Sequence, residues 1–250
     1  MSIMDNGPDA RELEPRTPPG EAPCERLRAV QARMAQAARS AGRAQDSVRL
    51  LAVSKTFDAQ AVRALAGCGQ REFGENYLQE ALAKQEVLRD LPLAWHFIGP
   101  IQSNKTRPIA ERFDWVHGVD RLKVAERLSA QRPSELPSLQ VCIEVNVSDE
   151  TSKSGVRPAE LAALAAAVAA LPRLRLRGLM AIPAPTPDPM AQRAAFRQVR
   201  EAYERLRAAG HALDTLSMGM SADLEAAILE GATIVRVGTA LFGERVKKHA

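Results

Sequence analysis

The stretch VRLLAV, residues 48–53, is the part of the sequence from which the fold can be worked out. It is a short, uninterrupted apolar run of the kind that forms a strand buried on both faces of a parallel sheet. Asp58 follows it and is a good N-cap residue, so a helix is predicted from there to about residue 66. A buried strand followed closely by a helix is the repeating unit of α/β folds.

The same alternation continues along the whole chain. Further strands are predicted at 71–74, 94–98, 114–117, 139–147, 174–181, 213–217 and 233–237. Helices are predicted at 25–41, 76–90, 103–112, 120–131, 157–170, 191–209 and 221–230. Eight strands that alternate with helices predict a single α/β domain, a (β/α)8 TIM-type barrel preceded by an N-terminal helix. A doubly wound open sheet is the alternative, but no glycine-rich dinucleotide fingerprint follows the first strand.

Composition narrows the class of protein. The 250 residues are 46% apolar and 26% charged, with a net charge of +4 and only 4% aromatic residues. Interspersed charges and few aromatic rings argue against nucleic-acid binding. The longest apolar run, residues 161–171, is too short to span a bilayer, and the N-terminus lacks the pattern of a signal peptide. We therefore expect a cytoplasmic protein with no membrane association.

The N-terminus and the cysteines complete the predicted organisation. Residues 1–23 contain five prolines and five acids with few large apolar residues, so they are expected to form a disordered leader before a barrel domain at 24–250. Cys24, Cys68 and Cys142 are odd in number, far apart and without a CxxC pair. This pattern predicts no disulfide framework and no zinc site. The histidines show no metal-ligand spacing either, and His96 is expected to be buried and hydrogen-bonded.

Lys55 is the most informative candidate for chemistry. The chain has only seven lysines against 27 arginines, and Lys55 alone directly follows a predicted buried strand. The C-terminal ends of the strands form the active-site face of such barrels. A desolvated lysine has a lowered pKa and can attack a carbonyl to form a Schiff base, which arginine cannot do. A lysine that merely reaches solvent from the barrel rim is the other reading.

The loops after the last two predicted strands suit a phosphate group. The segment SMGMSADLEAAI, residues 217–228, offers Ser221 as a helix cap, and RVGTALFG, residues 236–243, offers Gly238 and Thr239. Barrels often bind phosphate with these two loops. Two helix caps and a tight turn would explain the same residues without a ligand.

A lysine beside a phosphate cradle predicts a phosphorylated aldehyde or ketone as the ligand, either pyridoxal 5′-phosphate (PLP) or a class I aldolase substrate. Arg236 ends the last strand. Opposite a pyridine nitrogen, it would donate hydrogen bonds and leave that nitrogen unprotonated, which weakens PLP as an electron sink. A salt bridge within the barrel is the alternative role for Arg236.

With these residues assembled, the sequence resembles the pyridoxal phosphate homeostasis protein family, whose barrels are related to the N-terminal domain of alanine racemase. The resemblance covers about residues 25–245. It is carried by AVSKT (52–56), FGENYLQEAL (73–82), WHFIGPIQSNK (95–105), EVNVSDETSKSG (144–155), RGLMAIP (177–183), SMGMSADLEAAI (217–228) and RVGTALFGER (236–245).

The resemblance implies a role for each candidate. Lys55 would carry PLP as an aldimine, Arg236 would face the pyridine nitrogen, and Asn76 would belong to the site. Phosphate contacts are implied for Ser217, Ser221, Gly238 and Thr239. No metal is implied.

The family is thought to supply and buffer PLP rather than to turn over a defined substrate. We therefore expect a monomeric PLP reservoir or regulator that serves PLP-dependent apo-enzymes. A racemase-like or aldolase-like enzyme that uses the same lysine remains the alternative. Two-base racemases add a tyrosine from a second domain, and we expect no such domain after the barrel here. Tyr77 and Tyr203 are better explained by packing.

Overall fold

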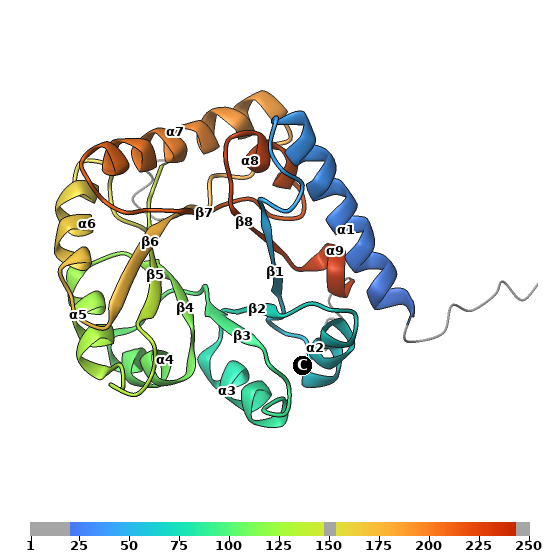
Figure 1. Cartoon of the computed structure of the whole chain (residues 1–250), viewed down its shortest axis with the longest axis horizontal. Coiled ribbons are helices and arrows are strands. Elements are labelled where there is room, and N and C mark those ends of the chain that lie inside the picture. The colour runs from blue at the N-terminus through green and yellow to red at the C-terminus, as the bar shows by residue number, and fades with distance from the viewer. Residues whose placement is uncertain (1–20, 148–153, 244–250) are drawn as a thin grey trace, which may run out of the picture.

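The computed structural model describes residues 21–147 and 154–243, and it shows a closed barrel of parallel strands in the order β1 to β8 (Figure 1). The barrel closes because β8 pairs with β1, with Leu51 opposite Arg236. The (β/α)8 fold predicted from the sequence is thus confirmed. The strands are β1 (Arg49–Val53), β2 (Glu72–Glu75), β3 (Ala94–Phe97), β4 (Trp115–Val119), β5 (Leu139–Glu144), β6 (Leu174–Met180), β7 (Thr215–Ser217) and β8 (Ile234–Val237).

Helices surround the barrel on the outside, as Figure 1 shows. Asp58 caps α2 as expected, since its carboxylate accepts a 2.8 Å hydrogen bond from the backbone N–H of Ala61. The helices are α1 (Glu21–Ser40), α2 (Ala59–Gly67), α3 (Leu78–Val87), α4 (Thr106–Arg112), α5 (Leu122–Gln131), α6 (Leu161–Ala169), α7 (Pro189–Ala208), α8 (Leu224–Leu229) and α9 (Thr239–Phe242), with a 3-10 turn at Ser103–Lys105. Within the described ranges, none of these helices is long and apolar enough to cross a membrane.

The alternation of side chains along each strand divides the core into two parts. The larger part lies between the strands and the surrounding helices and includes Phe73, Phe113 and Phe196, each nearly or fully buried. A smaller apolar cluster consists of Leu51, Val53, Ile98, Trp115, Cys142, Met180 and Ile234. Leu51 and Val53 belong to it while Ala52 belongs to the larger part, so successive β1 residues point to opposite faces. The smaller cluster therefore fills the barrel interior.

Helix α1 differs from the prediction at its start. It begins at Glu21 rather than at residue 25, because Pro23 falls in the first turn, where no intrahelical bond from its nitrogen is needed. The helix lies beside α8 and α9 (Figure 1), and Arg26 Nε donates a 2.6 Å hydrogen bond to the carbonyl of Leu241. The rest of the predicted leader, residues 1–20, lies outside the described residues, as does Lys153 of the SKSG segment.

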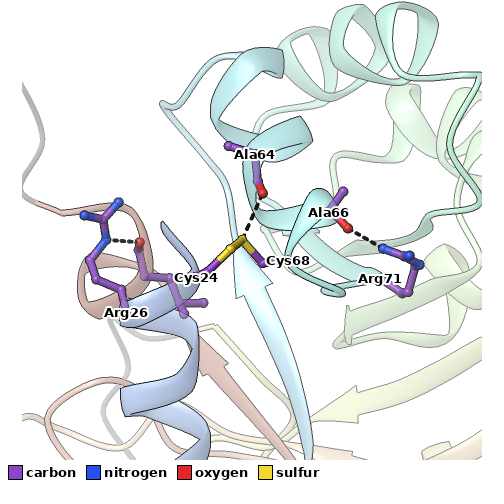
Figure 2. The surroundings of a disulfide bond; sticks show 7 residues. Cys24, Arg26, Ala64, Ala66, Cys68 and Arg71 are labelled. Atoms are coloured by element: carbon purple, nitrogen blue, oxygen red, sulfur yellow. Dashed lines mark hydrogen bonds between the residues drawn. A yellow bond between two sulfur atoms is a disulfide. The ribbon is translucent and has the colours of Figure 1, made fainter. Parts of the chain in front are cut away.

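The prediction that the cysteines form no disulfide is wrong. Cys24 in α1 and Cys68 at the end of α2 are joined by a disulfide, with their Cα atoms 5.3 Å apart (Figure 2). The two residues are separated by 44 positions in sequence, and only the packing of α1 against α2 brings them together. Cysteine spacing alone could not show this, because it contains no information about which helices are neighbours.

Candidate functional site

A cavity of about 270 Å³ opens at the C-terminal ends of the strands. Six of the seven predicted site residues line it; Arg236 lies within β8, and the others come from the segments after β1, β2, β7 and β8. Ser217 is not in its lining. The lining residues are Val53, Lys55, Phe57, Asn76, Ile98, Ile182, Met220, Ser221, Ala222, Arg236, Gly238 and Thr239. Residues from both ends of the sequence therefore meet at one site, because β1 and β8 are neighbours in the closed barrel.

Lys55 lies just beyond β1 and is half-buried at the cavity. The turn that carries it is held on both sides. The backbone N–H of Thr56 donates to Glu80 Oε1 at 2.6 Å, and Lys84 Nζ donates to the carbonyl of Ser54 at 2.7 Å. Thr56 has φ +71, a left-handed conformation that is unusual for a β-branched residue. Such strain persists only where the surroundings enforce it, so the position of Lys55 is well defined.

The support beneath Lys55 is a buried ion cluster that the sequence analysis missed. Lys84 Nζ donates to Glu75 Oε1 at 2.7 Å and to Glu80 Oε1 at 2.6 Å, and Glu75 also accepts from Ser54 Oγ at 2.6 Å. The side chains of Lys84 and Glu75 are only 5% and 0% exposed. Burial raises the pKa of Glu75, while the ammonium of Lys84 opposes this rise. The scarcity of lysine, used above for Lys55, applies equally to Lys84 and is the signal that could have identified it.

Arg236, on the neighbouring strand β8, lines the same cavity. Its Nη1 donates to the carbonyl of Ser217 at 2.5 Å and to Ser217 Oγ at 2.9 Å, and its Nη2 donates to the carbonyl of Ala181 at 2.9 Å. Burial lowers the pKa of Arg236 to about 10, with Glu144 and Asp223 acting in the other direction. A guanidinium has five N–H donors, so these contacts orient Arg236 and leave donors to face the cavity.

Ser217 lies beneath this arginine. Its side chain is fully buried, and its hydroxyl contacts Arg236 and His117. The structure therefore brings Ser217 to the site but positions it behind Arg236. The phosphate contact that the resemblance implied for Ser217 stays a prediction, and its neighbours favour an indirect role.

The sequence predicted Ser221 as a helix cap, but Ser221 is not the N-cap residue of the helix that follows it. Helix α8 begins at Leu224 and its N-cap residue is Asp223, whose Oδ1 accepts from the backbone N–H of Met220 at 2.6 Å. This contact closes a tight turn at 220–223, and Ser221 lies within that turn at the cavity. The carbonyl of Ser221 accepts a 3.0 Å hydrogen bond from Arg33 of α1, so the N-terminal helix also supports the loop.

Two observations indicate that the cavity is prepared for a polar ligand. Asn76 Oδ1 is buried and has no hydrogen-bond partner among the described residues. A buried polar atom of this kind is costly unless a ligand or water satisfies it. Near it, Gly238 packs closely against β1, where a Cβ atom would lie 3.3 Å from the carbonyl oxygen of Val53. The hydroxyls of Ser221 and Thr239 can donate to an anion, whereas Asn76 Oδ1 is an acceptor and requires a donor group.

Glu144 at the end of β5 adds a second titratable group near Arg236. Burial and the charge of Asp120 raise the pKa of Glu144 to about 7, although Arg236 opposes this shift. Within the described ranges, no three His, Cys, Asp or Glu side chains are arranged to hold a metal ion.

Comparison with known proteins identifies the family of the chain. The family described as "Alanine racemase, N-terminal domain" matches residues 26–246. The pyridoxal phosphate homeostasis protein of Pseudomonas aeruginosa is 65% identical over 221 residues, which cover 88% of this chain and 95% of that protein. The protein of the same name from Escherichia coli is 54% identical over 222 residues, with the same coverage of 88% and 95%.

Solved structures agree as well. PipY of Synechococcus elongatus, solved with PLP bound, is 40% identical with a TM-score of 0.79, and the match covers 88% of this chain and all of that one. Alanine racemase of Corynebacterium glutamicum is 20% identical with a TM-score of 0.64; the match covers 90% of this chain but 64% of the racemase, and it supports the fold alone.

The fold and the site thus define a barrel of the alanine racemase N-terminal type, with a lysine and an arginine facing one cavity. Within that class, the chain belongs to the pyridoxal phosphate homeostasis protein family, as its resemblance to that family implied.

Proposed function

We propose that this protein binds PLP in the cavity at the C-terminal ends of the strands and acts in PLP homeostasis. The observation that carries the proposal is the meeting of Lys55, Arg236 and the hydroxyls of Ser221 and Thr239 around one cavity. An amine, a cationic donor and an anion-binding group match the aldehyde, the pyridine nitrogen and the phosphate of PLP. The name of the Pseudomonas relative and the PLP-bound PipY structure support the same ligand.

Each residue has a defined task in this proposal. The Lys55 amine engages the aldehyde, the hydroxyls of Ser221 and Thr239 with the backbone at Gly238 hold the phosphate, and Asn76 Oδ1 gains the partner it lacks. Bound PLP supplies an electrophilic carbon conjugated to an aromatic ring. Arg236 donates to the ring nitrogen without protonating it, which limits the withdrawal of electrons that most PLP enzymes need.

That limit favours storage and delivery over catalysis. The cavity also has apolar residues exposed at its mouth, since Ile182 is 44% exposed and Met220 is 36% exposed. An open mouth suits a ligand that is taken up and released. We propose a PLP reservoir without defined turnover, working as a monomer in the cytoplasm and donating to PLP-dependent apo-enzymes.

The test is a visible absorption spectrum of the purified protein before and after borohydride reduction, followed by peptide mass mapping. We expect a band that bleaches on reduction and leaves a pyridoxyl group on Lys55. The Lys55→Ala variant should lose the label while keeping weaker, phosphate-dependent binding. A label that persists in Lys55→Ala would overturn the assignment of Lys55, and a wild-type protein that stays colourless with added PLP would overturn the function.

Ligand-dependent stability gives an independent measurement. PLP at about a hundred times its Kd should add roughly 2.7 kcal/mol to the free energy of unfolding. For a chain of this size the melting temperature should rise by roughly 5–11 °C.

A racemase-like or aldolase-like enzyme is the second candidate, because Lys55 in the same cavity could serve it. Solvent deuterium that enters the α-position of an amino acid at turnover rates would favour the racemase. Cleavage of a phosphorylated ketose would favour the aldolase.

A further inference from the structure

A line of buried polar side chains runs through the barrel interior below Arg236. His117 Nδ1 lies 2.8 Å from Ser217 Oγ, and His117 Nε2 lies 3.0 Å from His96 Nδ1. His96 Nε2 then faces Glu72 Oε2 at 4.0 Å. These residues come from β8, β7, β4, β3 and β2, so the line crosses the barrel from the cavity towards the N-terminal ends of the strands. The proposed function uses Arg236 and assigns no role to the residues below it.

The rings in this line are held firmly. Both histidines are fully buried, and His96 stacks on Trp115 with centroids 5.4 Å apart and an interplanar angle of 4°. The guanidinium carbons of Arg49 and Arg177 lie 4.7 Å and 4.9 Å from the centroid of Trp115. Burial lowers the pKa of both histidines well below the ordinary value, and the charges near them, Arg49 for both and Arg236 for His117, act in the same direction. Both imidazoles are therefore neutral, with one donor and one acceptor nitrogen each.

Arg236 and Glu72, at the two ends of the line, together favour one direction for its hydrogen bonds. A guanidinium can only donate, so Ser217 Oγ accepts from Arg236. The hydrogen bonds of the described residues give the Ser217 hydroxyl no acceptor for its own proton other than His117 Nδ1, so it donates there. His117 then carries its proton on Nε2 and donates to His96 Nδ1, which leaves the His96 proton on Nε2, facing Glu72. The opposite assignment would turn a bare nitrogen of His96 towards a carboxylate oxygen. Neither His96 Nε2 nor Glu72 Oε2 has a hydrogen-bond partner among the described residues, so the first assignment is the favourable one.

We propose that Ser217, His117 and His96 form a directional hydrogen-bonded chain that positions Arg236 for the ring nitrogen of PLP. This proposal rests on the proposed function. The three residues are positioning residues, because they act on the cofactor through Arg236. Ser217→Ala and His117→Phe remove a link each, whereas His117→Asn retains an amide oxygen that can accept from Ser217. Cys142→Ala is the matched control, since Cys142 is also fully buried in the barrel interior but lies outside the chain.

The test compares the Kd of PLP with that of its carbocyclic analogue, in which the pyridine nitrogen is replaced by CH. In the wild-type protein we expect PLP to bind more tightly. Ser217→Ala and His117→Phe should weaken PLP binding about tenfold and reduce the preference for PLP over the analogue by a similar factor. His117→Asn and Cys142→Ala should keep that preference. Equal losses for both ligands, or an unchanged preference in Ser217→Ala, would overturn the proposal.

A second measurement does not depend on the ligand. Nitrogen-15 chemical shifts of the wild-type protein should show both His117 and His96 protonated on Nε2 and bare on Nδ1. The other tautomer, or a charged imidazole at neutral pH, would overturn the directional chain. Failure of the proposed function has a different signature, because the wild-type protein would then take up no PLP while the tautomers stay as assigned. If His117→Phe does not fold, Ser217→Ala still decides the question.

Discussion

The side of the cavity that carries Lys55 is held by charged groups, whereas the side that carries Arg236 is held by neutral groups. We call the first side, Ser54 to Thr56 with Glu75, Glu80 and Lys84, the lysine wall. We call the second side, Ser217 to Gly219 with Arg236 and Gly238, the arginine wall. In the lysine wall a buried ammonium bridges two carboxylates, and in the arginine wall hydroxyl and carbonyl oxygens accept from a guanidinium.

The difference shows that cationic side chains at one site can have different roles. Lys84 forms ion pairs with Glu75 and Glu80 and stabilises the fold, whereas Lys55 lines the cavity. The hydrogen-bond acceptors of Arg236 described above are all neutral, so its charge is available to a ligand in the cavity. The lysine wall should therefore be sensitive to the loss of charge, and the arginine wall to changes in shape.

The largest effect is expected from breaking the lysine wall. Lys84→Met leaves Glu75 buried without its counterion, and it should lower the free energy of unfolding by about 3–5 kcal/mol. Urea denaturation measures this loss. The double variant Lys84→Met/Glu75→Gln removes both charges and should regain most of the stability. A double variant as unstable as the single one would show that packing, rather than charge, supports this wall.

The arginine wall should respond to added volume. Gly219 has φ +94, and a Cβ atom there would lie 2.5 Å from Ala227 Cβ. Gly219→Ala combines backbone strain with this clash and should cost about 2–3 kcal/mol. Gly69→Ala is the control, because Gly69 has φ +101 but open space around it, and strain alone should cost about 1 kcal/mol. Urea denaturation measures the two losses of free energy of unfolding. Equal losses would show that the clash with Ala227 does not destabilise the protein.

Glu144 lets the comparison be extended to pH. Its pKa is raised from 4.5 to about 7, so between these values the folded protein binds more protons than the unfolded chain. The stability linked to Glu144 is therefore fully present below about pH 4.5 and is lost as the pH rises through 7. Between pH 5 and pH 8 the free energy of unfolding of Glu144→Gln should fall by about 2 kcal/mol less than that of the wild-type protein. Urea denaturation at several pH values measures this difference. An unchanged slope would exclude Glu144 as its source.

The smallest effect on stability is expected at Thr56. Thr56→Gly removes the strain at φ +71 but adds freedom to the unfolded chain, so the free energy of unfolding should change by less than about 1 kcal/mol. PLP binding should weaken nonetheless, because the turn that carries Lys55 becomes less rigid. Arg173→Gly, at φ +59 in the turn before β6, is the control and should leave the Kd of PLP unchanged. Unchanged PLP binding in Thr56→Gly would show that the strain has no role at the site.

Much of this organisation could be predicted from the sequence. The run VRLLAV at 48–53 predicted β1 within one residue, because a buried parallel strand leaves a continuous apolar signal. Six of the seven predicted site residues line one cavity, because strand ends converge in a closed barrel. Helix α9 was missed, since its four residues are too few to show periodicity.

The rest depended on tertiary contacts that sequence patterns do not contain. Lys84 was assigned to a helix, and nothing in its spacing showed that α3 packs its ammonium beneath Ser54. Ser221 looked like a helix cap, but Asp223 folded back onto Met220 instead. Ser217 and His117 are 100 residues apart, and only closure of the barrel brings their side chains together.

The disulfide of Figure 2 has a consequence for the integrity of the chain. Cys24 and Cys68 close a covalent ring that contains β1 and Lys55. A protease that cuts once inside this ring, for example in the turn at 41–47 between α1 and β1, would leave two fragments that still migrate as one molecule on a non-reducing gel. The same cut would separate them as soon as a reductant opened the bond. In an oxidising compartment, helix α1 would therefore stay covalently attached to the barrel after this cleavage, whereas with reduced thiols only noncovalent contacts would hold it there.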